Sequence, residues 1–236
     1  LAVGALRADG QGNSINSSGA VYLFSFNDPS SPTSSANFGT DTGADQQIDV
    51  GDLSAQLASG ANVTLQASND ITLVDGLTVN NASGDGGKLT LQAGRSIALQ
   101  SGITSDNGDI DLLANSTAAD GVVDADREVG DAVIDQMANI DAGTGDVLFL
   151  MKDGTGNTNS VNGAITTGNI TAGGVTVRQE GAAGTGIAAQ GGSTITAGGD
   201  VTFRAQGTGS DITAGTIDAA GAIDLEAEDT VTFGGN

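Results

Sequence analysis

A short phrase of apolar, polar or small, and apolar residues recurs along most of the chain, and it limits the possible folds more than any other feature. Each copy follows a turn residue and has Thr, Asp or Ala at its centre. This alternation places two side chains on one face and one on the other, as in a half-buried β-strand. We therefore expect short strands at 63–65, 71–73, 77–79, 89–91, 97–99, 110–112, 175–177, 201–203, 223–225 and 231–233.

Glycine, asparagine and aspartate separate these phrases, as at 84–87, 106–109 and 143–146. Such residues tolerate positive φ angles and form tight turns. The chain is rich in glycine, with 38 residues, and holds only 2 prolines. The sequence therefore predicts strands and turns in strict alternation.

The longer phrases show a second period, since they begin near residues 63, 89, 110, 147, 175, 201 and 223. Apart from the wide gap after 110, this spacing fits one coil of a solenoid with about three short strands. Stacked coils let each strand pair with its copies about 4.8 Å above and below, so about seven coils would form a rod roughly 30 Å long. The predicted strand starts in four coils are Val63, Ile71 and Leu77; Leu89, Ile97 and Ile103; Val175, Ile187 and Ile195; and Val201, Ile212 and Ile217.

A β-sandwich is the main alternative fold. Its strands are usually antiparallel and about 5 to 6 residues long. The phrases here are shorter and more alike, which favours the solenoid. We therefore predict an all-β chain with a parallel β-helix over residues 62–236 and a core of small aliphatic side chains.

The first 61 residues have a different pattern. Residues 1–5 and 19–26 look like two strands joined by a polar loop, so we expect a β-hairpin over 1–28. Residues 29–61 begin with a Pro- and Ser-rich stretch and are interpreted as a linker and lead-in. No cap is recognisable at either end of the repeats, and the chain closes in mid-pattern at 233–236. We expect a piece of a longer protein.

Composition excludes several function classes. The chain has 29 acidic and 7 basic residues, a formal charge of −22, which argues against nucleic acid and anionic lipid as partners and makes divalent cations plausible ones. It has no histidine and no cysteine, so imidazole or thiolate catalysis and disulfides are excluded. No stretch approaches the roughly 20 apolar residues that span a bilayer. No signal peptide is recognisable at the N-terminus.

The repeats at 62–73 and 87–97, together with the Gly-Asn-Ile-Thr-Ala-Gly run at 168–173, resemble those of filamentous-haemagglutinin-like exoproteins. The resemblance covers about 46–236. It implies a right-handed parallel β-helix that a two-partner-secretion transporter exports across a Gram-negative outer membrane. It also implies a secreted or cell-surface protein with a role in adhesion or biofilm. The family's secretion domain is not recognisable here, and the glycan or protein that would be bound is not indicated.

The N-terminal segments 1–5 and 18–24 resemble a partial FG-GAP repeat, the blade unit of integrin-α-type propellers. The calcium loop of that family corresponds to Asp9, Gln11 and Asn13, which keep one of its three carboxylates. Calcium needs six to eight oxygen ligands. We weigh a calcium site at these three residues against a plain polar hairpin loop.

Three further features could carry function. Residues 207–213 partly match the calcium-binding β-roll repeat, which works only in tandem, so an ordinary turn is the alternative. The carboxylate pairs Asp109/Asp111 and Asp224/Glu226 could act as acid and base on a sugar, although such pairs arise by chance in an acidic chain. Residues 115–139 break the repeat and predict an irregular insertion, either a recognition loop or a solvated loop around one weak coil.

Together these features predict a non-enzymatic adhesin fragment that acts as an extended β-helical shaft. A carbohydrate-active β-helix enzyme is one alternative, and it should have a cleft where carboxylates and a base converge. A calcium-dependent structural surface-layer protein is another, and it should fail to fold in a chelator.

Overall fold

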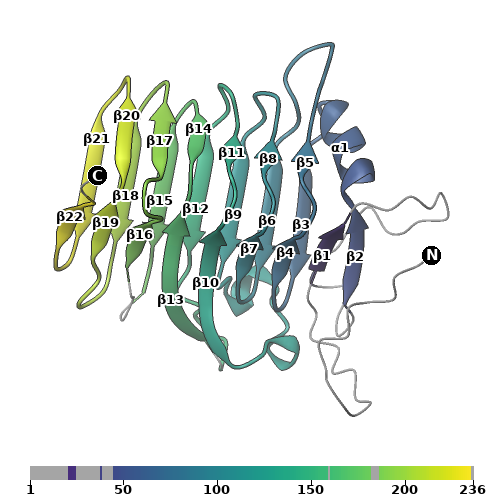
Figure 1. Cartoon of the computed structure of the whole chain (residues 1–236). Helices are drawn as coiled ribbons and strands as arrows, with labels where there is room; N and C mark the ends of the chain where they lie inside the picture. Colours follow the sequence, from purple (N-terminus) through teal and green to yellow (C-terminus); the bar gives the residue numbers. More distant parts are fainter. Residues whose placement is uncertain (1–20, 25–37, 39–44, 159, 182–185, 235–236) are drawn as a thin grey trace.

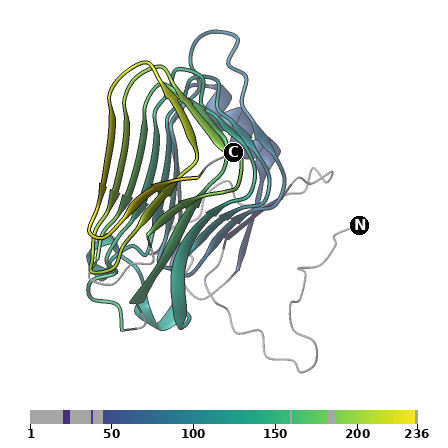
Figure 2. The ribbon, with the colours of Figure 1, turned by 60° about the vertical axis from the view of Figure 1, so that its left-hand side comes forward.

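The chain forms a parallel β-helix, in which three sheets run the length of a single stack of coils (Figure 1). The computed structural model describes residues 21–24, 38, 45–158, 160–181 and 186–234. Every strand pairing within these residues is parallel. A view turned toward the C-terminal end shows the coils superimposed around one interior (Figure 2). The predicted β-helix is confirmed.

One sheet, here called the long-phrase sheet, contains the five-residue strands. Its inward positions form ladders down the core, such as Leu65, Leu91 and Leu112. The first, third and fifth residues of each strand point inward because side chains alternate along a strand, and they are apolar except for Gln179 at the end of β15. Its members are β3 (Val63–Ala67), β6 (Leu89–Ala93), β9 (Ile110–Ala114), β12 (Val147–Met151), β15 (Val175–Gln179), β18 (Val201–Ala205) and β21 (Ile223–Ala227).

The other two sheets complete the coil. The second, here called the nine-stranded sheet, comprises β2 (Gln46–Asp49), β1 (Val21–Phe24), β4 (Ile71–Leu73), β7 (Ile97–Leu99), β10 (Gly130–Gln136), β13 (Ser160–Thr167), β16 (Ile187–Ala189), β19 (Ile212–Ala214) and β22 (Val231–Phe233). The third, here called the six-stranded sheet, comprises β5 (Leu77–Thr78), β8 (Ile103–Thr104), β11 (Ile140–Asp141), β14 (Ile170–Ala172), β17 (Thr194–Ala197) and β20 (Thr216–Ala219).

The predicted coil assignments agree with the strand register. Val63 pairs with Leu89, Ile71 with Ile97 and Leu77 with Ile103, so the first two coils stack as expected. The coils that begin at Val175 and Val201 also stack in the expected register across all three sheets. Equivalent phrases meet because only one offset buries all three apolar ladders at once.

The core holds two phenylalanines among the aliphatic ladders. Phe149 and Phe203 are fully buried on either side of Val177. A small residue between two large rings lets neighbouring coils keep their spacing while the interior stays filled.

Helix α1 (Val50–Ala58) covers the N-terminal end of the stack (Figure 1). Asp49 caps it, since its Oδ1 accepts hydrogen bonds from the N–H groups of Gly51 (2.6 Å) and Asp52 (3.1 Å), as an N-cap side chain should. Leu53 and Leu57 are each 1% exposed within the same core as the strands. The expectation of an uncapped N-terminal end is therefore wrong.

The sequence misses α1 because its apolar face has only three buried positions in a nine-residue helix. A pattern this short is easily taken for lead-in. β2 also lies within the predicted linker, and it pairs with β1. β1 in turn pairs in parallel with β4, so residues 21–24 belong to the solenoid's own sheet. The rest of the predicted hairpin lies outside the described residues.

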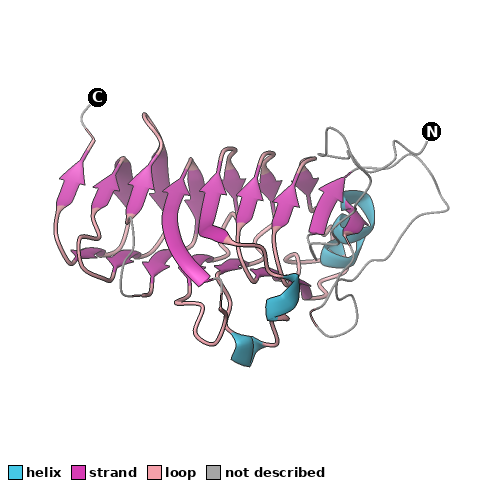
Figure 3. Ribbon diagram, turned by 90° about the horizontal axis from the view of Figure 1, so that it is seen from below, coloured by secondary structure: helices cyan, strands magenta, loops and turns pink. Residues whose placement is uncertain are grey.

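The irregular insertion is shorter than predicted. The chain leaves the stack after β9 and returns in β10, which begins at Gly130. β10 pairs with β13 from its first residue, with a register shift between Ala132 and Ile134, and pairs with β7 from Ile134 onward. Two short 3-10 helices, η1 (Ala118–Asp120) and η2 (Asp124–Asp126), lie in this detour, which projects from the side of the stack (Figure 3). We call residues 115–129 the excursion. Among the described helices, none has the length and apolar character needed to cross a bilayer.

Candidate functional site

The predicted calcium ligands Asp9, Gln11 and Asn13 lie outside the described residues. Within the part that the structure describes, no group of three or more acidic side chains is placed to hold a metal ion. In the β-roll-like turn, Asp211 Oδ1 accepts a hydrogen bond from Thr230 N–H (3.0 Å), and Ser210 Oγ donates to Gln206 O (3.0 Å). These side chains hold their own turn and the coil beyond it.

The candidate catalytic pairs have structural partners. Asp111 forms an ion pair with Lys88 (2.7 Å), and Asp109 Oδ1 accepts from the N–H of Asp146 (2.9 Å). At the C-terminal end, Arg204 bridges the two carboxylates of the other pair, which lie 3.0 and 3.4 Å away. An acid–base pair needs one group free to give or take a proton at a reacting atom. In both pairs, each carboxylate already has a partner within the described residues.

Acidic and amide side chains at the turns join successive coils. Asn62 Oδ1 accepts from Lys88 N–H (2.9 Å), Asp70 Oδ1 from Ser96 N–H (3.0 Å), and Asp200 Oδ1 from Ala222 N–H (2.8 Å). Each bond satisfies a backbone donor at a turn, where the strand ladder does not reach it. Part of the chain's high acidic content therefore serves the stack.

A buried arginine anchors the excursion to the stack. Arg127 is 2% exposed, and its guanidinium donates to Gly94 O (2.8 Å), Asn115 Oδ1 (3.1 Å) and Glu128 O (3.2 Å). Burial lowers the pKa of Arg127, and the nearby positive charge of Arg95 lowers it further. A side chain at Gly94 would collide with Ser68 O and with the excursion, so the close approach requires glycine there.

Arg95 joins the excursion to the first coil. Its Nε donates to Asp70 Oδ1 (2.9 Å), and its Nη2 contacts both Asp70 and Glu128 Oε2, the latter at 3.0 Å. The hydrogen bond to Asp70 makes the largest contribution to raising the pKa of Arg95. Planar two-point pairing of this kind fixes geometry as well as charge.

The other side of the excursion rests on the loop after β12. Lys152 Nζ lies 2.9 Å from both carboxylate oxygens of Asp120, and Asp124 Oδ1 accepts from Thr158 N–H (2.9 Å). Burial opposes ionisation of Asp120, but hydrogen bonds from Lys152 and Thr117 outweigh it and lower its pKa. Hydrogen bonds from Thr158 lower the pKa of Asp124. Charged residues of the predicted recognition loop thus hold the excursion against the stack.

The outer surface of the excursion is partly apolar. Val129 is 76% exposed and Val161, on the adjoining part of β13, is 49% exposed. Val161 pairs with Asp131 of β10, two residues after Val129, so the end of the excursion lies near β13. Exposed apolar side chains beside charged ones are common at interaction sites.

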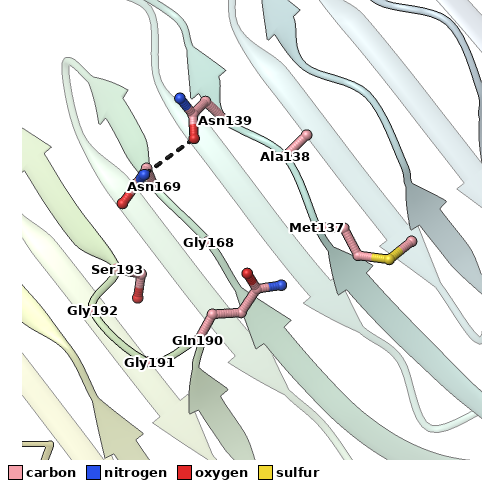
Figure 4. A pocket seen from close by; sticks show the side chains of 9 residues that line it. All are labelled: Met137, Ala138, Asn139, Gly168, Asn169, Gln190, Gly191, Gly192 and Ser193. Carbon is pink, nitrogen blue, oxygen red and sulfur yellow. Dashed lines mark hydrogen bonds between the residues drawn. The ribbon is translucent and has the colours of Figure 1, made fainter.

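Hollows on the outer surface of the described residues include two of different size. The larger, of about 440 Å³, opens over Gly174, in the turn before β15, between Asp146 and Asp200. The smaller, of about 140 Å³, lies between the ends of β10, β13 and β16 and the six-stranded sheet, with Asn139, Asn169, Gln190 and Ser193 in its lining (Figure 4). We call the smaller one the amide hollow.

Sequence reasoning missed the amide hollow, although a signal for it exists. Asn139 and Asn169 each precede an isoleucine that begins a strand of the six-stranded sheet, which marks them as equivalent turn residues. The third equivalent turn, 190–193, is longer and contains two glycines. The difference in turn length is visible in the sequence, but the hollow that it creates is not.

The chain was compared with protein-family models, curated proteins and solved structures. No protein-family model matches it, and neither a curated protein nor a solved structure matches it significantly.

Proposed function

We propose that this chain is a non-enzymatic, extended β-helical shaft of a large secreted or surface-anchored bacterial adhesin, with a role in adhesion or biofilm. The observation that carries the proposal is the in-register stacking of equivalent coils around one continuous apolar core. Such a stack gains length by repetition, because each coil contacts only its neighbours.

The use of the charged side chains supports a mechanical role. Carboxylates at the turns bind backbone N–H groups of the next coil, and arginines bridge coils or hold the excursion. These contacts resist the sliding and separation of coils. Catalysis would instead require titratable groups that converge on an open cleft.

Export by two-partner secretion is part of the proposal. The likeness of residues 62–73 and 87–97 to haemagglutinin-type repeats supports it, as does the absence of cysteine from the chain. We propose a Gram-negative cell surface as the location and an outer-membrane transporter as the export partner.

An adhesion assay with a parallel turnover assay tests the proposal. Beads coated with the full chain should adhere to bacterial biofilm matrix more strongly than beads coated with an acidic control protein of similar charge. The chain should release no reducing ends from plant, bacterial or host polysaccharides. Adherence equal to the control would overturn the adhesive role, and saturable release of reducing ends would establish an enzyme.

A melting experiment with a chelator tests the alternative that the chain is a calcium-dependent surface-layer protein. Circular dichroism melting in excess EGTA and in millimolar calcium should give the same midpoint if the stack needs no ion. Loss of the folded signal in EGTA would replace the shaft proposal by a calcium-dependent structural protein.

A further inference from the structure

The amide hollow exists because one turn is longer than its neighbours. Two residues, 168–169, connect β13 to β14, whereas four residues, 190–193, connect β16 to β17. The longer turn projects outward and forms one wall, while Met137 to Asn139 form the opposite wall (Figure 4). The side chains on these walls come from three successive coils.

Backbone partners fix the orientation of the amide side chains. Asn169 Oδ1 accepts from Thr194 N–H (2.8 Å), so its Nδ2 must be the atom that donates to Asn139 Oδ1 (3.1 Å). Gln190 Nε2 donates to the carbonyl oxygen of Gln136 (2.7 Å). An amide carries its donor and its acceptor on opposite atoms. Asn139 Nδ2 and Gln190 Oε1 are therefore left as a free donor and a free acceptor among the described residues.

Ser193 adds a hydroxyl that the protein does not use. The residue lines the hollow, and its Oγ makes no hydrogen bond within the described residues. A hydroxyl both donates and accepts hydrogen bonds, so Ser193 Oγ is available to a group that enters the hollow.

A buried glutamine holds the floor of the hollow. Gln136 is fully buried, and its Nε2 donates to Ala138 O (2.9 Å) and Asn169 O (2.8 Å). Its Oε1 accepts from Gly168 N–H (2.9 Å). The polar atoms of the Gln136 side chain thus link the segments that form the walls of the hollow. The free groups of Asn139 and Gln190 are therefore fixed in position before a ligand binds.

The lining selects for a neutral ligand. The chain carries a charge of −22, yet none of the residues that line the amide hollow is charged. The free groups are one amide donor, one amide acceptor and one hydroxyl, beside the half-exposed side chain of Met137. Sugar hydroxyls both donate and accept, and a sugar ring also has an apolar C–H face. A volume of about 140 Å³ corresponds to about five water molecules, the scale of a single ring.

We propose that the amide hollow is a subsite for one neutral pyranose unit of a glycan. Asn139 and Gln190 bind its hydroxyls, Ser193 binds a further oxygen, and Met137 packs on the C–H face. The inference rests on the adhesive function proposed above, since it names the class of surface ligand.

Nuclear magnetic resonance of the full chain tests the subsite. The probes are the methyl glycosides of glucose, galactose, mannose and N-acetylglucosamine, each titrated to high millimolar concentration. At least one should cause saturable shifts of the Asn139 and Gln190 side-chain amides and of the Ser193 backbone amide. Ser193→Ala and Asn139→Ala should each weaken binding about fivefold, as expected for the loss of one neutral hydrogen bond.

Two further variants keep the test decisive. Met137→Ala removes an exposed side chain and should weaken binding without disturbing the fold, even if Ser193→Ala misfolds. Thr202→Ala, on the outer face of the long-phrase sheet, should leave binding unchanged. The subsite is refuted if no glycoside gives saturable shifts, or if binding survives in Met137→Ala and Asn139→Ala. Adherence of coated beads without glycoside binding would refute the subsite while leaving the shaft proposal intact.

Discussion

The two ends of the stack differ although the same ladders run through both. At the N-terminal end, α1 covers the core, and Leu65 on β3 is fully buried. At the C-terminal end, Ile223 is 49% exposed and Phe233 is 64% exposed. Leu65 and Leu225 occupy equivalent positions of one ladder, linked coil by coil through the sheet register.

The difference shows that burial in a solenoid depends on the next layer. A coil supplies an apolar face in either direction, and the residue is buried only where a coil or a cap lies above it. At the N-terminal end a helix provides the cover and contributes Leu53 and Leu57 to the core, while β1 and β2 extend the nine-stranded sheet alone. The four predictions below test this contrast.

The largest effect should come from the matched leucines. Leu65→Ala should destabilise the chain by about 2 to 5 kcal/mol, because it leaves a cavity in a closed core. Leu225→Ala should cost about 1 kcal/mol or less, because its side chain is already partly in water. Urea unfolding followed by circular dichroism would measure both. Equal losses would mean that the C-terminal end is covered in solution.

Removal of the helix cap should have a smaller effect. Asp49→Ala should cost about 1 kcal/mol, the usual value for a lost N-cap, and should loosen α1 before the strands beneath it. Asp211→Ala removes an exposed carboxylate that also accepts from one backbone N–H and serves as the control, with a cost of about 0.5 kcal/mol. Thermal melting would compare them. A larger loss for Asp211→Ala would contradict the importance of the cap.

Acid should loosen the middle of the stack before either end. The pKa values of Asp120, Asp124 and Asp153 are lowered in the folded state. These carboxylates therefore contribute fully to the free energy of unfolding above their unfolded pKa of about 3.9. The contribution is lost as the pH falls through their lower pKa values in the folded state. Amide hydrogen exchange at stepped pH should show release of the excursion and of residues 152–158 below about pH 4.

Asp120→Asn provides the control for the acid experiment, because it removes one of the three titrating groups. The variant should show a weaker pH dependence in the excursion than the unchanged chain. If β21 and β22 exchange first on acidification, the assignment of acid sensitivity to the middle is wrong.

The smallest effect should come from the exposed ion pairs of the C-terminal end. Arg204 and its partners Asp224 and Glu226 have side chains that are 43%, 52% and 66% exposed. Arg204→Gln should cost at most about 1 kcal/mol and should matter less as salt is added. Arg95→Gln should cost more, since Arg95 is 18% exposed and holds the excursion. Denaturant midpoints at low and high salt would separate the two.

The local pattern of the sequence determined most of the strands and turns and the stacking register of the regular coils, but it did not predict β10, β11, β13 or β14. Alternation over three to five residues decides which side chains point inward, and the spacing of equivalent phrases decides which strands meet. Both properties are repeated many times, so errors at single phrases did not alter the prediction. The same pattern gave no indication of a specific site among the outward threonines.

Only the tertiary structure decided what lies outside the repeat. The helix that covers the N-terminal end, the arginine that anchors the excursion and the amide hollow each depend on residues from different coils. Arg127 binds a carbonyl oxygen 33 residues away, and Asn139 meets Asn169 across 30. Each of these contacts occurs only once in the molecule, so no periodic pattern in the sequence could predict it. The sequence by itself therefore determined the stack, because stacking repeats one local rule. It could not determine the ends or the surface, since each of those depends on a single three-dimensional arrangement.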